Sequence, residues 1–337
     1  MQELGKSCNN VFMQSTQAKA AKPANEIRVI APSYYWEPGF EERDNRAKER
    51  LEGLGYKVTL GEHLASHYHL GTARAEDRVA DFHKAVSDES VKIIVAYSGG
   101  WSANEMLPLI DWGLVKANPK PLVGYSDITV LLNAIYAKTG NIGLLGPDYG
   151  ALGNETEWQY TLDHLALALQ REYEMKLKPS KEWSSKDGEA ARQSRWSILQ
   201  EGEAEGVLIG GNFNTFHLLQ GTQYQPIFDR PFVLVAEDDD ESGKLTTRYF
   251  SRRLESILQI PGVRKNLRAI VIGRFLPKSN VAAEELASVI ASKSLGDIPV
   301  VSNMDFGHTL PILTLPIGGR LELSAKGEGI EIVVTRA

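Results

Sequence analysis

Three polar residues at the ends of expected strands could together perform acyl transfer: Ser126, Glu237 and His308. Ser126 follows the apolar run PLVGY, Glu237 follows PFVLVA, and His308 lies in the loop sequence NMDFGHT. A serine hydroxyl becomes an effective nucleophile when an imidazole accepts its proton, and a carboxylate orients that imidazole and stabilises its cation. The three residue types, in the order serine, acid, histidine, therefore predict nucleophilic catalysis.

Ser126 also has a structural interpretation, because capping is the usual function of a serine that precedes a helix. The residues after it place apolar side chains at helical spacing, at Ile128, Leu131, Leu132 and Ile135. The local sequence GYSDI lacks the second glycine of the G-x-S-x-G nucleophile motif. The local sequence thus leaves capping and catalysis both open.

The same corner would supply backbone donors for a tetrahedral oxyanion. The first N–H groups of a helix have no intrahelical acceptor and favour a bound anion, which makes the N–H of Asp127 a candidate donor. The segment SGGW should lie on the same rim of the sheet, and it offers the N–H groups of Gly99, Gly100 or Trp101. Either source would stabilise negative charge beside Ser126.

A second cluster, EHLASHYH, contains His63, His67 and His69 within seven positions. Three histidines could bind zinc, but the segment has no HExxH spacing and no cysteine partner. The glycine pairs in SGG and IGGN lack the spacing of phosphate-binding loops. We therefore predict a polar loop near the sheet rim, with no metal site and no phosphate-binding loop.

The elements that must position these residues follow from hydrophobic periodicity. In the first half, strands alternate with helices, which predicts a parallel sheet with helices on its faces and a ligand site at the carboxyl ends of the strands. In the second half, strands and helices are mixed. Strands are expected at 26–32, 56–60, 91–100, 121–125, 206–216, 231–238, 268–273 and 299–304, and helices at 40–55, 73–87, 156–170, 246–259 and 282–293.

Length and composition set the wider limits. A chain of 337 residues fits two domains, and we predict a leader over 1–25, an N-terminal nucleophile domain over 26–170, a linker or insertion over 171–203, and a C-terminal domain over 204–337. The net charge of −6, without a Lys/Arg block, argues against nucleic acid as partner. No apolar run approaches the ~20 residues that span a bilayer.

The single cysteine, Cys8, cannot form an internal disulfide, and the leader has no apolar core typical of a signal peptide. We therefore expect a cytoplasmic protein that is not associated with a membrane and that acts on a small or peptidic substrate.

Eight sequence blocks, in order along nearly the whole chain, resemble the LD-carboxypeptidase family of serine peptidases, which includes the microcin immunity peptidases. The blocks are RVIAPS (28–33), AYSGGWSANEML (96–107), GYSDITVLLNAI (124–135), GVLIGGNFNTFHLLQGT (206–222), VLVAED (233–238), AIVIGRF (269–275), DFGHT (305–309) and TLPIG (314–318).

The resemblance implies a triad of Ser126, Glu237 and His308 that straddles two domains, with an oxyanion hole from the N–H groups of Gly100 and Asp127. It implies an α/β fold, with an N-terminal parallel-sheet domain like that of class I glutamine amidotransferases and a smaller, β-rich C-terminal domain. It also implies a cytoplasmic homodimer that uses no metal or organic cofactor.

The family divides by substrate. LD-carboxypeptidases remove the terminal D-alanine from muropeptide tetrapeptides, whereas immunity members cleave the amide between a peptide, or its terminal aspartate, and a modified nucleotide. The segment KPSKEWSSKDGEAARQSRW resembles the insertion of the immunity branch, and the indole of Trp183 or Trp196 could stack on a base for ~1–3 kcal/mol. The same indoles could instead pack beneath a linker, and DFGH is closer to the carboxypeptidase pattern.

We predict an LD-carboxypeptidase first and a peptidyl-nucleotide hydrolase as the alternative. Further substrate contacts are predicted for Trp101, Trp183, Asn212 and Arg248; the last is a cation that could pair with a substrate carboxylate. From another class, a two-domain protein that only binds a small molecule would share the strand and helix pattern. An amidotransferase-like enzyme would lack its cysteine, because Cys8 lies in the leader.

Overall fold

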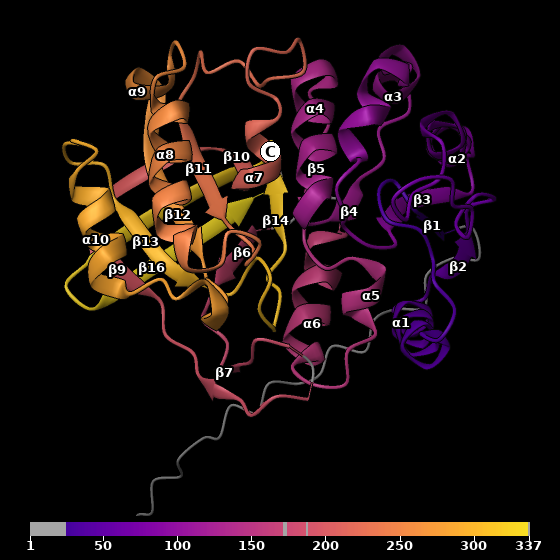
Figure 1. The fold of residues 1–337 in the computed structure, drawn as a ribbon, viewed down its shortest axis with the longest axis horizontal. Coiled ribbons are helices and arrows are strands. Elements are labelled where there is room, and N and C mark those ends of the chain that lie inside the picture. Colours follow the sequence, from indigo (N-terminus) through magenta and orange to yellow (C-terminus); the bar gives the residue numbers. More distant parts are fainter. Residues whose placement is uncertain (1–24, 171–173, 187, 336–337) are drawn as a thin grey trace, which may run out of the picture.

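The structure, a computed structural model, describes residues 25–170, 174–186 and 188–335. The predicted leader, apart from its last residue, lies outside the described residues, and so does Cys8. The described chain forms a two-domain α/β protein, with the N-terminal domain (indigo to magenta) beside the C-terminal domain (orange to yellow) in Figure 1. No helix in these described ranges is long and apolar enough to cross a membrane.

The N-terminal sheet has the strand order β14-β5-β4-β3-β1-β2, and its first five strands along the chain are parallel. Parallel neighbours need crossover connections, which the expected helices supply. The strands are β1 (Glu26–Ile30), β2 (Lys57–Leu60), β3 (Val91–Ala96), β4 (Leu122–Gly124), β5 (Gly143–Leu145) and the antiparallel β14 (Leu315–Ile317). The helices are α1 (Glu41–Gly53), α2 (Ala75–Ser87), η1 (Ala103–Leu109), α3 (Trp112–Ala117), η2 (Ser126–Ile128), α4 (Thr129–Thr139), α5 (Tyr149–Leu152) and α6 (Trp158–Ala168).

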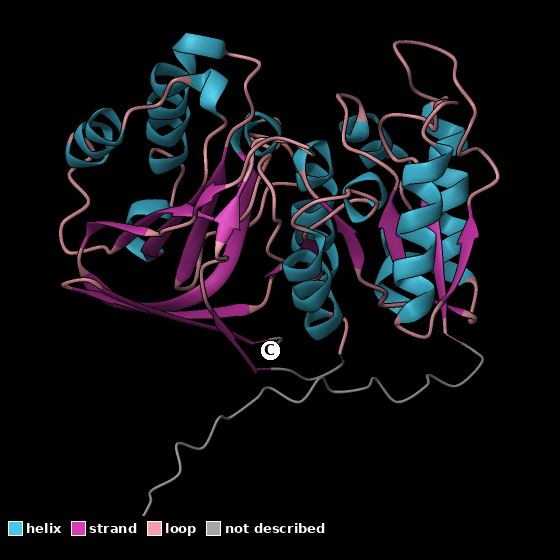
Figure 2. Ribbon diagram, turned by 90° about the horizontal axis from the view of Figure 1, so that it is seen from below, coloured by secondary structure: helices cyan, strands magenta, loops and turns pink. Residues whose placement is uncertain are grey.

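The C-terminal sheet is mixed, with the order β6-β16-β15-β10-β11-β12-β13-β9 and a parallel centre from β10 to β13. Figure 2 shows its strong twist next to the helix-covered N-terminal sheet. The strands are β6 (Glu174–Leu177), β9 (Ser197–Gln200), β10 (Gly202–Asn212), β11 (Phe232–Glu237), β12 (Leu267–Gly273), β13 (Val300–Met304), β15 (Arg320–Lys326) and β16 (Gly329–Thr335). The helices are α7 (Phe213–His217), η3 (Gly243–Leu245), α8 (Thr246–Leu258), α9 (Val263–Asn266), η4 (Pro277–Ser279) and α10 (Ala283–Ala291).

Strand pairing crosses the predicted domain boundaries twice. The segment 171–203, expected as a linker or insertion, supplies both edge strands of the C-terminal sheet, β6 and β9, and the small hairpin of β7 (Glu182–Trp183) and β8 (Arg192–Gln193) between them. In return, β14 joins the N-terminal sheet through β5. Within the described residues, the C-terminal sheet has eight strands and the N-terminal sheet has six, which agrees with the expectation of a β-rich second domain.

The two domains share a core, and α4 lies between them (Figure 1). The buried side chain of Asn133 donates to the Gly210 carbonyl at 2.8 Å and accepts from the Gly210 N–H at 3.0 Å. One turn earlier, the Thr129 hydroxyl accepts from the Asn212 N–H at 3.0 Å. A Cβ at Gly211 would lie only 2.6 Å from that hydroxyl, so the close approach requires glycine. These bonds fix the C-terminal domain against the helix that follows Ser126.

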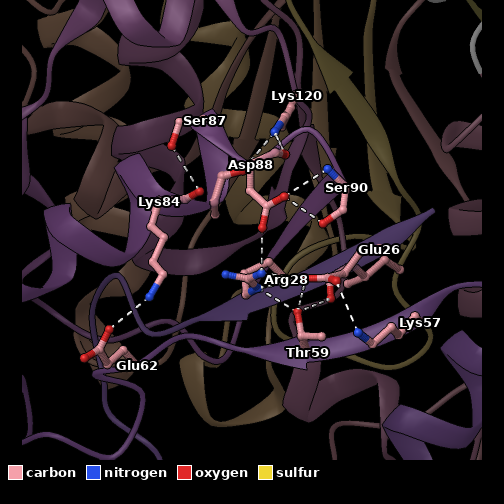
Figure 3. A network of polar contacts seen from close by, with 12 residues as sticks. Glu26, Arg28, Lys57, Thr59, Glu62, Lys84, Ser87, Asp88, Ser90 and Lys120 are labelled. Atoms are coloured by element: carbon pink, nitrogen blue, oxygen red, sulfur yellow. Dashed lines mark hydrogen bonds and ion pairs between the residues drawn. The ribbon is translucent and has the colours of Figure 1, made fainter. Parts of the chain in front are cut away.

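A polar network joins the opposite, amino-terminal ends of the strands (Figure 3). Arg28 on β1 donates to Glu26 at 2.6 Å, to Thr59 on β2 at 2.6 Å, and to Asp88 after α2 at 3.2 Å. The pairing between Arg28 and Glu26 is nearly buried, which strengthens it relative to an exposed ion pair. The network therefore ties β1 to β2 and to the segment before β3.

Candidate active site

The structure brings Ser126, His308 and Glu237 into one hydrogen-bonded chain. His308 Nε2 lies 3.0 Å from Ser126 Oγ, and His308 Nδ1 lies 2.8 Å from Glu237 Oε2. Ser126 follows β4 in the N-terminal domain, Glu237 ends β11, and His308 lies in the loop between β13 and β14. The arrangement has the geometry of a nucleophile, a base and an orienting acid contributed by both domains.

The backbone at Ser126 is the tight turn that a serine nucleophile requires. Its φ is +56°, which is rare for a residue with a side chain, and it joins β4 directly to η2 and α4. The side chain caps neither helix, and its hydroxyl contacts His308. A Cβ at Gly99 would lie 2.8 Å from Ser126 Cβ, so the neighbouring loop needs glycine to pack here. The strand-turn-helix context of the nucleophile elbow is therefore present without its second glycine.

Three loops meet around the predicted oxyanion hole. The buried carboxylate of Asp127 accepts from the Ser33 hydroxyl at 2.6 Å and from the Ala103 N–H at 2.8 Å. Burial raises the pKa of Asp127, and these hydrogen bonds oppose the shift. Gly100 has a φ of +141°, and a Cβ there would lie 2.3 Å from the Ser33 hydroxyl. The side chain of Asp127 thus ties together the loops that hold the backbone of Gly100 and its own N–H beside Ser126.

The charges around His308 favour its imidazolium form. Burial is the largest single influence and disfavours the cation, but the carboxylates of Glu237, Asp239 and Asp238 together outweigh it and raise the pKa of His308 to about 9. The Tyr125 ring packs edge-on against the imidazole at 5.2 Å between centroids. The site is therefore built to stabilise a proton on His308, the state that follows proton transfer from Ser126.

The other residues predicted to contact the substrate differ in exposure and in hydrogen bonding. Trp101 is exposed, and its Nε1 donates to Glu241 Oε1 at 2.5 Å across the two domains. Asn212 is buried, and its side-chain oxygen caps α7 through the Thr215 N–H at 3.0 Å, so it has a structural function. Arg248 is exposed in the first turn of α8 and forms no hydrogen bond or ion pair with any residue in the described ranges.

The two tryptophans of the segment 178–196 have different environments. Trp196 is buried and donates to Asp305 at 2.8 Å, so the prediction that it could stack on a base is wrong. The Trp183 ring contacts the guanidinium groups of Arg192 at 4.9 Å and Arg274 at 4.7 Å, and it lines a cavity of about 460 Å³. Only Trp183 is placed to meet a ligand.

Sequence reasoning missed two buried carboxylates. Asp305, three residues before His308, pairs with Arg274 at 2.9 Å and accepts from Ser180, Ser194 and Trp196. Asp305 thereby anchors the segment 178–196 to the His308 loop. Its position in the sequence block DFGHT could have indicated a function for this carboxylate. Asp148, which follows β5, is buried and caps α5 through the Ala151 N–H at 2.8 Å; an aspartate at the end of a rim strand could have indicated it.

The histidine cluster does not converge. His63 Nδ1 contacts Asp81 at 3.0 Å, and the His67 ring packs against Tyr35 at 5.0 Å. Within the described ranges, no three His, Cys, Asp or Glu side chains form a group that could hold a metal ion. His63 and His67 therefore make local contacts near the rim of the sheet.

Family models match both domains in order. Residues 27–146 match the LD-carboxypeptidase N-terminal domain, and residues 205–323 match the LD-carboxypeptidase C-terminal domain. YocD, a putative carboxypeptidase of Bacillus subtilis, is 37% identical over 91% of this chain and 96% of its own length. The chain belongs to the LD-carboxypeptidase family. As a member of this family it is a serine-type carboxypeptidase, a hydrolase, and the resemblance read from the sequence is confirmed.

Relatives of this LD-carboxypeptidase family member include proteins with different ligands. The murein tetrapeptide carboxypeptidase of Pseudomonas aeruginosa is 28% identical over 80% of this chain and 84% of its own. The crystal structure of an MccF-like protein from Bacillus anthracis superposes with a TM-score of 0.89 at 36% identity, covering 94% of this chain and 98% of that one. MccF in complex with glutamyl sulfamoyl guanosine superposes with a TM-score of 0.82 at 25% identity, covering 95% and 98%.

Proposed function

We propose that the protein is an LD-carboxypeptidase that hydrolyses an L,D-peptide bond of muropeptides with Ser126 as nucleophile. The observation that supports the proposal is the hydrogen-bonded chain from Ser126 through His308 to Glu237. A relative named murein tetrapeptide carboxypeptidase provides the substrate class.

In the proposed mechanism, Ser126 Oγ attacks the scissile carbonyl carbon while His308 Nε2 accepts the hydroxyl proton. Glu237 keeps Nδ1–H in place and stabilises the imidazolium. The N–H groups of Gly100 and Asp127 donate to the oxyanion. His308 then protonates the leaving amine of D-alanine, and a water molecule, deprotonated by the same imidazole, hydrolyses the acyl-serine ester.

A carboxypeptidase must also bind the free carboxylate of the terminal residue. Arg248 is the proposed partner, because it stands exposed at the start of α8, the helix that follows the Glu237 loop, and has no ion pair within the described ranges. A guanidinium can bind a carboxylate through two parallel hydrogen bonds.

The second candidate is hydrolysis of a peptidyl or aspartyl nucleotide, which the similarity to the MccF-like protein and to ligand-bound MccF favours. In this chain Trp196 is buried. The Trp183 ring already contacts the guanidinium groups of Arg192 and Arg274, and a stacked base would compete with them. The muropeptide therefore remains the first proposal.

A side-by-side assay tests both candidates. Purified protein is incubated with a murein tetrapeptide that ends in D-alanine and with aspartyl sulfamoyl adenosine, and released D-alanine and nucleotide are measured. We expect D-alanine release from the wild type and from the distant surface variant Ser87→Ala, and none from Ser126→Ala. Circular dichroism checks that both variants are folded.

Turnover by Ser126→Ala equal to that of the wild type would refute the nucleophile assignment. Cleavage of the nucleotide substrate alone would refute the muropeptide proposal. A protein that only binds ligands would bind the tetrapeptide without releasing D-alanine, and a fluorophosphonate would not label Ser126.

A further inference from the structure

A cavity of about 460 Å³ lies in the C-terminal domain, and no residue of the triad lines it. It is bordered by the ends of β12 and β13, the edge strand β9, the hairpin of β7 and β8, and the start of α10. Figure 1 shows β9, β13 and α10 next to one another in this part of the domain. A volume of this size is typical of pockets that hold small molecules. The cavity is therefore a candidate for a second binding site.

The wall of the cavity combines apolar surface with positive charge. Phe275 and Leu286 contribute to its apolar part. Its charged side chains are Arg192 and Arg274, and no aspartate or glutamate among the described residues lines it. The whole chain has a net charge of −6, so a cavity wall with two cations and no carboxylate is unusual for this protein and favours an anionic ligand.

Arg274 is 2% exposed and has one nitrogen without a partner. Its Nε donates to the Asn303 side-chain oxygen at 3.0 Å, and its Nη2 donates to Ser194 at 2.8 Å and to Asp305 at 2.9 Å. Its Nη1 has no acceptor among the residues that the structure describes. A buried donor without an acceptor is costly, and Nη1 is thus the nitrogen left for an anion in the cavity.

The buried partner of Arg274 is already fully used. Asp305 also accepts from the Ser180 N–H at 3.0 Å, from the Ser180 and Ser194 hydroxyls at 2.8 Å and 2.9 Å, and from Trp196 at 2.8 Å. This carboxylate offsets the charge of Arg274, so the net positive charge of the wall comes from Arg192. Arg274 contributes a free donor, and Arg192 contributes the attraction for an anion.

The start of α10 adds a second, independent source of donors. This helix is nine residues long, no side chain caps its first turn, and Ala282 and Ala283 line the cavity. The first N–H groups of a helix have no intrahelical acceptor and favour a bound anion. Glu284 and Glu285 of the same turn are exposed, and neither lines the cavity. An uncapped helix start and a buried guanidinium with a free nitrogen therefore meet at one cavity.

The Trp183 ring controls access to the guanidinium. Nη1 of Arg274 is shielded from solvent, and the Trp183 ring packs on the guanidinium at 4.7 Å. This ring belongs to the two-residue strand β7 and is partly exposed. A shift of the ring would let an anion reach Nη1 and would leave a flat aromatic surface beside it.

We propose that this cavity is a second binding site, for an organic anion that joins one carboxylate or phosphate group to an apolar body. The anionic group binds Nη1 of Arg274 and the first N–H groups of α10, and the body packs against Phe275 and Leu286. The inference goes beyond the proposed function, because it involves neither the triad nor turnover.

Benzoate and phenyl phosphate are the test ligands, and benzamide is the neutral compound of similar shape. Each is titrated into the full chain by isothermal titration calorimetry. We expect saturable binding of at least one of the two anions below about 10 mM, and binding of benzamide about tenfold weaker or less. The difference between benzoate and phenyl phosphate shows which anionic group the site prefers. Ser126→Ala should bind the anions as the wild type does.

Two variants locate the site. Ala283→Asp places a carboxylate at the start of α10, where acidic residues are tolerated, and should weaken anion binding about tenfold or more. Its control is Ser288→Asp, which adds the same charge to an exposed position five residues later, about 140° around the helix axis, and should leave the affinity unchanged. Arg274→Lys keeps a cation for Asp305 but removes Nη1, and should also weaken binding. If Arg274→Lys does not fold, the exposed position of Ala283→Asp keeps the test available.

No saturable binding of either anion up to about 10 mM would overturn the proposal. Equal binding of benzamide and benzoate would overturn the assignment of an anion site. Unchanged affinity in folded Ala283→Asp would place the anion elsewhere and would also overturn it. The titrations need no turnover, so their result is separate from the proposed function, which fails if wild-type protein releases no D-alanine.

Discussion

Replacing Glu237 by glutamine tests how the site makes His308 a base. Glu237 has the largest effect among the carboxylates that together raise the pKa of His308 from 6.5 to about 9 against burial, so its removal should lower that pKa by about 2 units. The same interaction stabilises the imidazolium in the transition state, so kcat/KM on the alkaline plateau should fall by about 100-fold. Glutamine can also donate to Nδ1 and favour the wrong tautomer, which adds to the loss.

The assay is kcat/KM for release of D-alanine from pH 5 to 10, which reports the pKa of the essential base in the free enzyme. In the wild type, activity should rise with pH toward about 9, because only the neutral imidazole can accept the Ser126 proton. In Glu237→Gln the rise should end about two pH units lower. Glu62→Gln, which removes an exposed carboxylate paired with Lys84 at 3.1 Å, should change neither quantity. An acid limb at the same pH in wild type and Glu237→Gln would refute the reasoning.

Two further changes test substrate binding and the domain interface. Arg248→Gln should raise KM for the tetrapeptide about tenfold or more but leave an amidated tetrapeptide unaffected, because only the free carboxylate pairs with the guanidinium; equal effects on both substrates would remove Arg248 from the site. Asn133→Ala should lower the free energy of unfolding by about 2–4 kcal/mol, measured by urea denaturation, because it leaves the buried N–H and C=O of Gly210 unpaired. A change below about 0.5 kcal/mol would show that this pair does not hold the domains together.

Local sequence was sufficient for much of the fold. Alternating apolar runs and helical spacing placed the strand before Ser126 and the helix after it, and the apolar run of β11 ends at Glu237 as expected. These features depend on neighbouring residues, since side-chain periodicity and strand length are local properties. Because the carboxyl ends of parallel strands meet at one edge, the expectation that the SGGW and GYSD segments share a rim also followed from the sequence.

Other features depended on pairing between distant segments. The polar segment 171–203 gave no clear strand pattern, yet β6 and β9 complete the C-terminal sheet, because edge strands bury little apolar surface and need few apolar residues. The short strand β14 is apolar and fully buried, but its local sequence does not specify that it pairs with β5 in the other sheet.

The sequence by itself determined which residues could react and at which strand ends they stand. Only the tertiary structure decided that Ser126 and His308, 182 residues apart, meet at 3.0 Å, that Trp196 is buried against Asp305, and that Asp148 is buried at the start of α5. The reason is physical: the charge state and hydrogen bonds of a side chain depend on burial and on neighbours brought together by packing, which no local pattern specifies.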